Sequence, residues 1–170
     1  MAGAVILPDG LIIDGLRDSK QVPENERKRL FHDIACNALA IGIGIVDAGT
    51  IDKINILQST KLAMEAAVRD LKQAPDIILI DAVKLPRIEI TQQSIIKGES
   101  VSASIAAASI IAKVVRDHIM ESYHEKYPAY NFKKHKGYST QEHMKCIRLH
   151  GPCPIHRKTF RKVMDMELPL

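Results

Sequence analysis

The sequence is poor in aromatic residues and cysteine: it has no tryptophan, and its three cysteines, Cys36, Cys146 and Cys153, include no Cys-x-x-Cys pair. An odd number of separated cysteines argues against a disulfide framework and favours reduced thiols in the cytoplasm. No run of 18 apolar residues is present, which excludes an ordinary membrane-spanning helix. The opening stretch MAGAVILPDG carries no lysine or arginine, so we expect no signal peptide. These absences predict a cytoplasmic chain without a membrane partner.

Positive charge is concentrated in one part of this chain of 170 residues, which is 46% hydrophobic and carries a net charge of +4. Between His124 and Lys162 the sequence holds ten Lys and Arg residues and only two acids. All four tyrosines lie between Tyr123 and Tyr138. Cations for phosphates and rings for bases predict a nucleic-acid-binding face. The alternative is a solvated basic surface over tyrosines that belong to the core.

Apolar runs of strand length alternate with stretches of helical spacing, which predicts an α/β domain. We expect strands over residues 2–7, 40–49 and 76–81, helices within 18–39 and over 51–73 and 102–115, and a loop over 87–98. Residues 11–15 are a candidate return strand. The capping box at Ser139–Glu142 predicts another helix, which Gly151 and Pro152 end. No repeat or linker divides the chain, so we expect one domain over 1–170 with a basic helical region at about 124–170.

The segment from Ile96 to Asp117 combines a glycine, one acid and a run of small residues. Residues 102–115 are apolar nearly all round, which predicts a buried helix that packs closely on its neighbours. Ser100 or Ser102 can cap its first turn. Glu99 then precedes the helix, where backbone N–H groups and the helix dipole favour negative charge.

Asp81 and Glu99 are the candidates for metal chemistry. Asp81 ends the strand expected over 76–81, and ligands of α/β sheets gather at the carboxyl ends of strands. Two carboxylates beside a basic face suit Mg²⁺ or Mn²⁺ acting on a phosphodiester, because these ions prefer oxygen ligands. A two-metal site needs more than two carboxylates, so further acids are expected elsewhere. The ordinary alternatives are a turn residue for Asp81 and a helix-start carboxylate for Glu99.

Two other kinds of site fit the sequence less well. A cluster of histidines and cysteines lies at zinc-like spacing near the C-terminus, but zinc sites of this kind usually contain Cys-x₂-Cys pairs. Ser109 precedes Lys113 by four residues, whereas a Ser-x-x-Lys nucleophile needs three. No glycine-rich phosphate-binding motif is present. The members of the histidine and cysteine cluster are His143, Cys146, His150, Cys153 and His156.

A series of motifs, in order along nearly the whole chain, resembles the bacterial ribonuclease HII family. They are DSK at 18–20, INI at 54–56, ILIDA at 78–82, IKG with an acid and a serine at 96–100, SIAAASIIAKVVRD at 104–117, HKGYSTQEH at 135–143 and HRKTF at 156–160. The resemblance implies a ribonuclease H-like α/β fold, with a mixed sheet, flanking helices and C-terminal helices. It also implies an endonuclease that hydrolyses RNA in RNA–DNA hybrids and cuts 5′ to ribonucleotides embedded in DNA, by two-metal catalysis with Mn²⁺ or Mg²⁺.

The same resemblance implies roles for particular residues. Asp81 and Glu99 fall on two of the family's four metal-binding acids. Tyr138 falls on the tyrosine that packs at the RNA–DNA junction and helps to sense the 2′-hydroxyl. Substrate binding is further expected of Lys20, Ser19 and Lys136. No obligate protein partner is implied.

The sequence departs from the family pattern in two places. It lacks the Asp-Glu-x-Gly-Arg-Gly stretch of the first, central strand, so we expect a partial fold without that strand and impaired activity. Glu99 stands where the family usually has Asp, and an extra methylene can displace the carboxylate by about 1 Å, a misplacement that can cost about a hundredfold in rate. The alternative function is a non-catalytic nucleic-acid-binding module, which would not need the missing acids.

Overall fold

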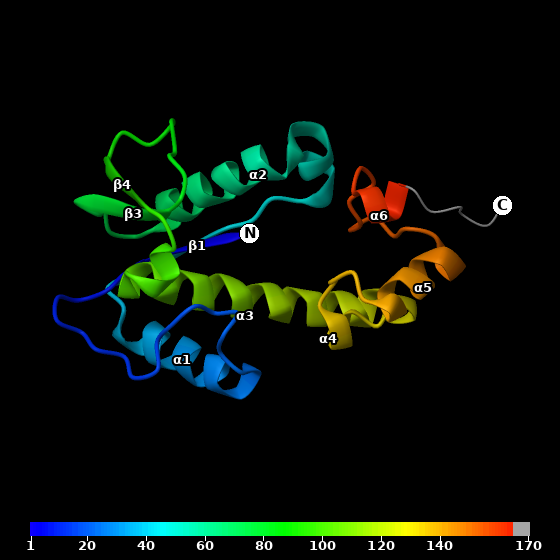
Figure 1. Cartoon of the computed structure of the whole chain (residues 1–170), viewed down its shortest axis with the longest axis horizontal. Coiled ribbons are helices and arrows are strands. Elements are labelled where there is room, and N and C mark those ends of the chain that lie inside the picture. Colours follow the sequence, from blue (N-terminus) through cyan, green and yellow to red (C-terminus); the bar gives the residue numbers. More distant parts are fainter. Residues whose placement is uncertain (165–170) are drawn as a thin grey trace. The chain divides into compact units, whose positions relative to one another are not determined.

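The computed structural model of the chain describes residues 1–164, and their contacts divide them into two compact units. Unit 1 comprises residues 1–45 and 60–114, and unit 2 comprises residues 46–59 together with the described part of the chain from 115 onwards. Figure 1 shows the elements in order along the chain. Within the described residues every strand belongs to unit 1, whereas unit 2 is built from helices and turns.

The strands of unit 1 pair in two separate sheets. β1 (Ala2–Ile6) pairs antiparallel with β2 (Ala40–Gly44), and β3 (Ile77–Asp81) pairs parallel with β4 (Thr91–Ile95). Within residues 1–164 no strand joins the two pairs, so the strands predicted at 2–7 and 76–81 lie in different sheets. The predicted α/β class is confirmed.

Two sequence predictions about strands are wrong. Residues 11–15 form turn and irregular structure rather than a return strand. Residues 91–95, expected within a loop, form β4. The sequence of β4 is Thr-Gln-Gln-Ser-Ile and most of it is exposed or half-buried, so it lacks the apolar run that marks a covered strand. Backbone pairing with β3, rather than side-chain burial, makes this segment a strand.

The helices follow the predicted order. The long ones are α1 (Glu24–Asn37), α2 (Ala48–Asp70), α3 (Ala103–Lys126) and α5 (Gln141–His150). Short turns are α4 (Phe132–His135), α6 (Arg161–Met164) and the 3₁₀ segments η1 (Gly98–Ser100) and η2 (Pro128–Tyr130). α2 is interrupted at Asn55, which has a φ of 67° and whose side chain accepts a hydrogen bond of 3.1 Å from the Gln58 N–H. Asn55 therefore caps the second part of α2.

Small residues bring α2 and α3 close to the strands of unit 1. A Cβ atom on Gly3 of β1 would lie 2.6 Å from the carbonyl oxygen of Ala108 in α3. A Cβ atom on Gly44 of β2 would lie 1.8 Å from the carbonyl oxygen of Ala63 in α2. The expected close packing of the Ser/Ala helix is therefore confirmed. Residues 104–115 of α3 are all buried or half-buried, and its fully covered side chains are Ile105, Ala106, Ala107, Ile110 and Ile111.

Replacing Gly44 by Ala should lower the free energy of unfolding by about 1–3 kcal/mol, because the added methyl group meets backbone that cannot rotate away. Chemical unfolding followed by circular dichroism measures the change. Gly49→Ala is the matched control, since Gly49 is exposed in the first turn of α2, where alanine is the better helix former. Equal unfolding midpoints for the two variants would contradict the close approach of β2 and α2.

Unit 2 has its own core, built from aromatic, aliphatic and sulfur-containing side chains. Asp52 in the first part of α2 ties this core to the C-terminal loop: it accepts hydrogen bonds from the Lys158 N–H at 2.7 Å and from the Thr159 N–H and hydroxyl at 3.0 and 2.6 Å. The buried members of the unit 2 core are Tyr130, Phe132, Ile147, Cys153 and Val163.

Among the described residues, every helix is too short or too polar to cross a membrane.

The sequence correctly predicted a capped start for α5, but the N-cap residue lies one position later than predicted. Thr140, not Ser139, is the N-cap, and its hydroxyl accepts a hydrogen bond of 3.2 Å from the His143 N–H. Glu142 bonds to Asn131 at 2.7 Å instead of closing a capping box. Gly151, with a φ of 71°, ends α5 as predicted.

Candidate active site

The parallel pairing of β3 and β4 brings the two candidate metal ligands to one edge of a sheet. Asp81 is the last residue of β3 and pairs with Ile95, the last residue of β4. Two residues separate the end of β4 from the start of η1, which contains Glu99. Because parallel strands end at the same edge, Asp81 and Glu99 lie close enough for the charge of Asp81 to raise the pKa of Glu99. The site therefore depends on β4, the strand that the sequence did not reveal.

Asp81 is held by the turn that leads into η1. One of its carboxylate oxygens, Oδ1, accepts a hydrogen bond of 2.9 Å from the Gly98 N–H. A Cβ atom on Gly98 would lie 2.5 Å from the side chain of Ile105 and 3.5 Å from the Cα of Asp81. Lys97, directly before it, has a left-handed backbone with a φ of 57°. The glycine of the IKG motif thus lets the turn lie against the end of β3, with its N–H aimed at the carboxylate.

The carboxyl group of Glu99 forms a hydrogen bond with Asp18, a residue that the sequence did not identify as part of the site. Burial, a hydrogen bond with Asp18 and the negative charges of Asp18 and Asp81 raise the pKa of Glu99 from 4.5 to about 7, against the opposing effect of Lys20. The same hydrogen bond, with a second from the Lys20 N–H at 2.9 Å, lowers the pKa of Asp18. Asp18 is therefore the more acidic member of the pair, and Glu99 is the less acidic one. The position of Asp18 in a turn, two residues before Lys20, was the sequence feature that could have identified it as a site residue.

Two of the expected substrate-binding residues lie in the same loop as Asp18. The Lys20 side chain is 79% exposed, and its Nζ lies 3.8 Å from an oxygen of Glu99, whose side chain is 20% exposed. Ser19 is buried. The Lys20 cation therefore lies beside Glu99 and is exposed to solvent, whereas the Ser19 side chain is buried.

The other two expected substrate-binding residues belong to unit 2. Lys136 donates hydrogen bonds to Glu121 at 2.5 Å and to the Lys133 carbonyl at 2.6 Å, and its side chain is 13% exposed. Tyr138 is 54% exposed, and the guanidinium of Arg116 lies 5.0 Å from the centre of its ring. Lys136 is engaged within the unit, whereas the Tyr138 ring is accessible to a ligand.

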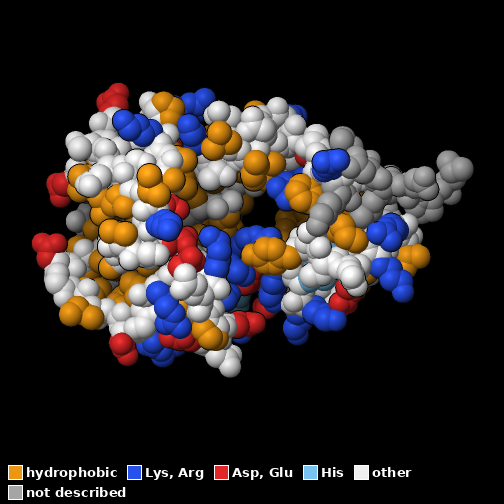
Figure 2. Space-filling view, in the orientation of Figure 1, with side chains coloured by type: hydrophobic (Ala, Val, Ile, Leu, Met, Phe, Trp, Pro, Cys, Tyr) orange, Lys and Arg blue, Asp and Glu red, His pale blue; other side chains and the backbone are white. Residues whose placement is uncertain are grey.

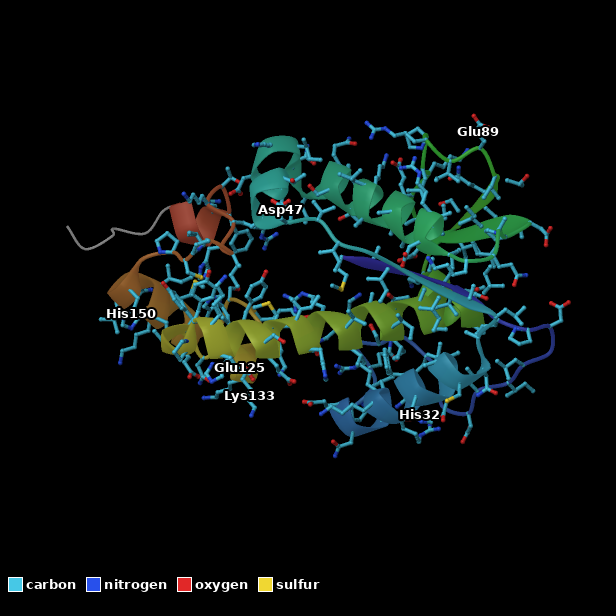
Figure 3. The ribbon with its side chains drawn as sticks, turned by 180° about the vertical axis from the view of Figure 1, so that it is seen from behind. His32, Asp47, Glu89, Glu125, Lys133 and His150 are labelled. Carbon is cyan, nitrogen blue, oxygen red and sulfur yellow. The ribbon has the colours of Figure 1, made fainter. Side chains whose placement is uncertain are left out.

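The basic segment of unit 2 is exposed, but most of its tyrosines are not part of that surface. Tyr130 is buried and donates a hydrogen bond of 2.7 Å to the Gly151 carbonyl, while Tyr123 and Tyr127 pack against the core. Of the four tyrosines, Tyr138 is therefore the one with an exposed ring, and its role in binding nucleic acid stays a prediction. Figure 2 shows Lys and Arg side chains on the surface, and in Figure 3 the labelled Lys133 points away from α4. The exposed cations are Lys126, Lys133, Lys134, Lys145, Arg148, Lys158 and Arg161.

The acids of the site provide some, but not all, of the ligands of a metal centre. Asp81 and Glu99 supply oxygen ligands of the kind that Mg²⁺ and Mn²⁺ prefer. Within residues 1–164, however, no group of three or more acidic, histidine or cysteine side chains is placed to hold a metal ion. The described residues therefore do not fit a two-metal centre.

The histidine and cysteine cluster near the C-terminus is a core feature and not a zinc site. His143, Cys153 and His156 are buried, and they bond to one another and to backbone groups. His150 is exposed at the end of α5. In the part of the chain that the structure describes, these side chains do not converge on a common metal position.

Comparison with known proteins gives a consistent result. The family model described as Ribonuclease HII matches residues 5–163. A ribonuclease HII of Acetivibrio thermocellus is 55% identical over 162 residues, which are 95% of this chain and 63% of that protein. A ribonuclease HII of Bacillus pumilus is 53% identical over 166 residues, 98% of this chain and 65% of that protein. The crystal structure of the ribonuclease H2 from Pyrococcus horikoshii OT3 matches with a TM-score of 0.69 and 24% identity, over 88% of this chain and 79% of that one.

The fold is therefore that of the ribonuclease H class, with two acids at a strand edge. The chain belongs to the ribonuclease HII family, as the motifs predicted. It spans 63% and 65% of the lengths of the two relatives described above, which is less than two thirds of each.

Proposed function

We propose that this chain provides the substrate-binding surface and two of the metal-binding acids of an endonuclease. Its substrates are RNA in RNA–DNA hybrids and single ribonucleotides in DNA, which it cuts on the 5′ side. The observation that carries this proposal is the meeting of Asp81 and Glu99 at the carboxyl edge of β3 and β4, with the Lys20 cation beside them. Membership of the ribonuclease HII family supports the same function. The three cysteines are free thiols, which supports a cytoplasmic location.

Asp81 and Glu99 would hold the divalent ion, Mn²⁺ or Mg²⁺. Such an ion stabilises negative charge that develops on a phosphate oxygen. The Gly98 N–H fixes the Asp81 carboxylate, and Lys20 is placed to neutralise the phosphate backbone or the acids. The two-metal catalysis that the family resemblance implies needs further acids, and the chain contains no Asp-Glu-x-Gly-Arg-Gly stretch to supply them.

A non-catalytic nucleic-acid-binding module is the second candidate. The observation that favours it is the same shortage of acids among the described residues, together with the exposed cations of unit 2. An enzyme cuts in the presence of metal when its acids are complete, whereas a binding module never does. Cleavage of a duplex that contains one ribonucleotide therefore separates the two candidates.

Tyr138→Ala should weaken binding to a DNA duplex with one ribonucleotide by about tenfold, and binding to plain DNA by less than about twofold. The lost stacking contact is worth about 1–3 kcal/mol, and it applies where the ring meets the ribonucleotide. Fluorescence anisotropy at one fixed salt concentration measures both affinities. Phe160→Ala is the matched control, because Phe160 is also an exposed ring beside an arginine, 4.5 Å from Arg157. Equal losses on both duplexes would show that Tyr138 does not sense the ribonucleotide.

A further inference from the structure

A continuous chain of hydrogen bonds crosses the core of unit 2 and ends on Tyr138. The Nδ1 of His143 lies 2.9 Å from the Tyr138 carbonyl oxygen. The Nε2 of His143 lies 3.0 Å from the Nε2 of His156. The Nδ1 of His156 in turn lies 3.0 Å from the backbone nitrogen of Cys153. Both rings are buried, so water does not compete for these bonds.

The bonding pattern fixes where each proton sits. A carbonyl oxygen can only accept, so the Nδ1 of His143 must carry a hydrogen and its Nε2 must accept. His156 therefore donates from Nε2, and its Nδ1 accepts the Cys153 N–H at 3.0 Å, the shortest of three contacts of this nitrogen, the others being the Cys153 Sγ at 3.1 Å and the Cys153 carbonyl oxygen at 3.3 Å. Both imidazoles are neutral in this arrangement, and all four ring nitrogens have a partner. Burial also lowers the pKa of both groups, in agreement with neutral rings.

A third histidine, His135, packs beside this chain of hydrogen bonds and holds the same segment. The ring of His135 stacks on that of His143 with centres 4.3 Å apart. Its Nε2 donates to the Tyr130 carbonyl at 2.7 Å, and its Nδ1 accepts the Gly137 N–H at 3.2 Å. The segment from His135 to Tyr138 is therefore fixed through side chains as well as backbone.

Tyr138 has a fixed backbone and an accessible ring. Its N–H donates to the His135 carbonyl at 2.8 Å, and its carbonyl accepts both the Thr140 N–H at 2.8 Å and the hydrogen of His143. The ring lies over the Arg116 guanidinium and remains about half exposed. The orientation of the exposed ring therefore depends on buried bonds behind it.

We propose that His143 and His156 are positioning residues that orient Tyr138 for the ribonucleotide. The inference rests on the proposed role of Tyr138 in substrate binding. It links the HRKTF motif, which supplies His156, to the HKGYSTQEH motif, which supplies Tyr138 and His143. Neither histidine touches the substrate, so both act through the backbone of Tyr138.

Two substitutions at His143 separate positioning from simple packing. In His143→Asn the amide nitrogen takes the place of Nδ1 and keeps the bond to the Tyr138 carbonyl. In His143→Leu a side chain of similar size has no donor. We expect the Asn variant to retain the preference for a duplex with one ribonucleotide over plain DNA within about threefold, and the Leu variant to lose about tenfold. Equal losses in variants with matched unfolding temperatures would overturn the inference.

Nuclear magnetic resonance of the unsubstituted protein provides a second test that does not depend on how the variants fold. The ¹⁵N shifts of the imidazole rings should show a hydrogen on Nδ1 of His143 and on Nε2 of His156 at pH 7. The opposite tautomers, or charged rings, would overturn the inference. If Tyr138→Ala leaves the ribonucleotide preference unchanged, the proposed role of Tyr138 fails and the positioning role fails with it. If Tyr138→Ala removes the preference but His143→Leu does not, only the positioning role is overturned.

Discussion

Joined to a strand that bears Asp-Glu-x-Gly-Arg-Gly, the chain should cut a DNA duplex at a single ribonucleotide, and by itself it should cut at least about a hundredfold more slowly. The reason is the shortage of ligands: Mg²⁺ gives up its waters reluctantly and binds weakly to few carboxylates. The described residues offer Asp81 and Glu99, and burial together with a hydrogen bond to Asp18 raises the pKa of Glu99 to about 7, so that it gives up its proton less readily than an ordinary carboxyl group. The measurement is gel-resolved cleavage of the labelled duplex in Mg²⁺ and in Mn²⁺.

Asp81→Asn should abolish cleavage by the joined protein, because the amide keeps the shape of the side chain and its oxygen can still accept the Gly98 N–H, but the charge is lost. Asp76→Asn is the matched control, since Asp76 is an exposed acid just before β3. Robust cutting by the unjoined chain that Asp81→Asn removes would show that the site needs fewer acids than proposed. Loss of cutting in both variants would point to a general loss of charge instead.

Lowering the pH from 7.5 to 5 should destabilise the protein by about 2 kcal/mol through His143 alone. Burial lowers the pKa of His143 from 6.5 to about 4, so below pH 6.5 the unfolded chain binds a proton that the folded chain does not. This contribution to stability is complete above pH 6.5 and is lost as the pH falls toward 4. The rings of His135 and His156 face His143, and electrostatic repulsion from these two neighbours lowers the pKa of His143 further. Urea unfolding at pH 7.5, 6 and 5 measures the effect.

His143→Asn should flatten this dependence, while His150→Asn should leave it unchanged, because His150 is exposed at the end of α5. Carboxylates titrate alike in both variants, so the difference between their slopes isolates the buried ring. Identical slopes in the two variants would show that His143 already binds its proton in the folded state.

Local signals in the sequence were sufficient for much of the fold. The apolar run at 76–81 predicted β3 and placed Asp81 at its end. The small residues of α3 predicted its close approach to the strands, which Gly3 and Ala108 now show. The helix stop at Gly151 followed from the need for a left-handed residue there. Each of these features depends on residues close together in the chain, or on one repeating pattern.

Features that depend on distant partners were missed. β4 is polar, and only its pairing with β3 makes it a strand. The break in α2 at Asn55 lies inside an otherwise continuous helical pattern. The tyrosines between 123 and 130 have the composition of a nucleic-acid surface, but packing assigns them to a core.

The sequence by itself determined the family, the order of most elements, and Asp81 and Glu99 as the candidate acids, because each of these depends on residues within a contiguous motif. Only the tertiary structure decided that the two acids meet, that Asp18 forms a hydrogen bond with Glu99, and that Lys136 is paired with Glu121. The same holds for the histidines, which lie at zinc-like spacing in the sequence but bond in series behind Tyr138 in the structure. A pKa, an ion pair and a tautomer each depend on which groups surround a side chain in space, and strand pairing and core packing bring those groups together from distant parts of the sequence.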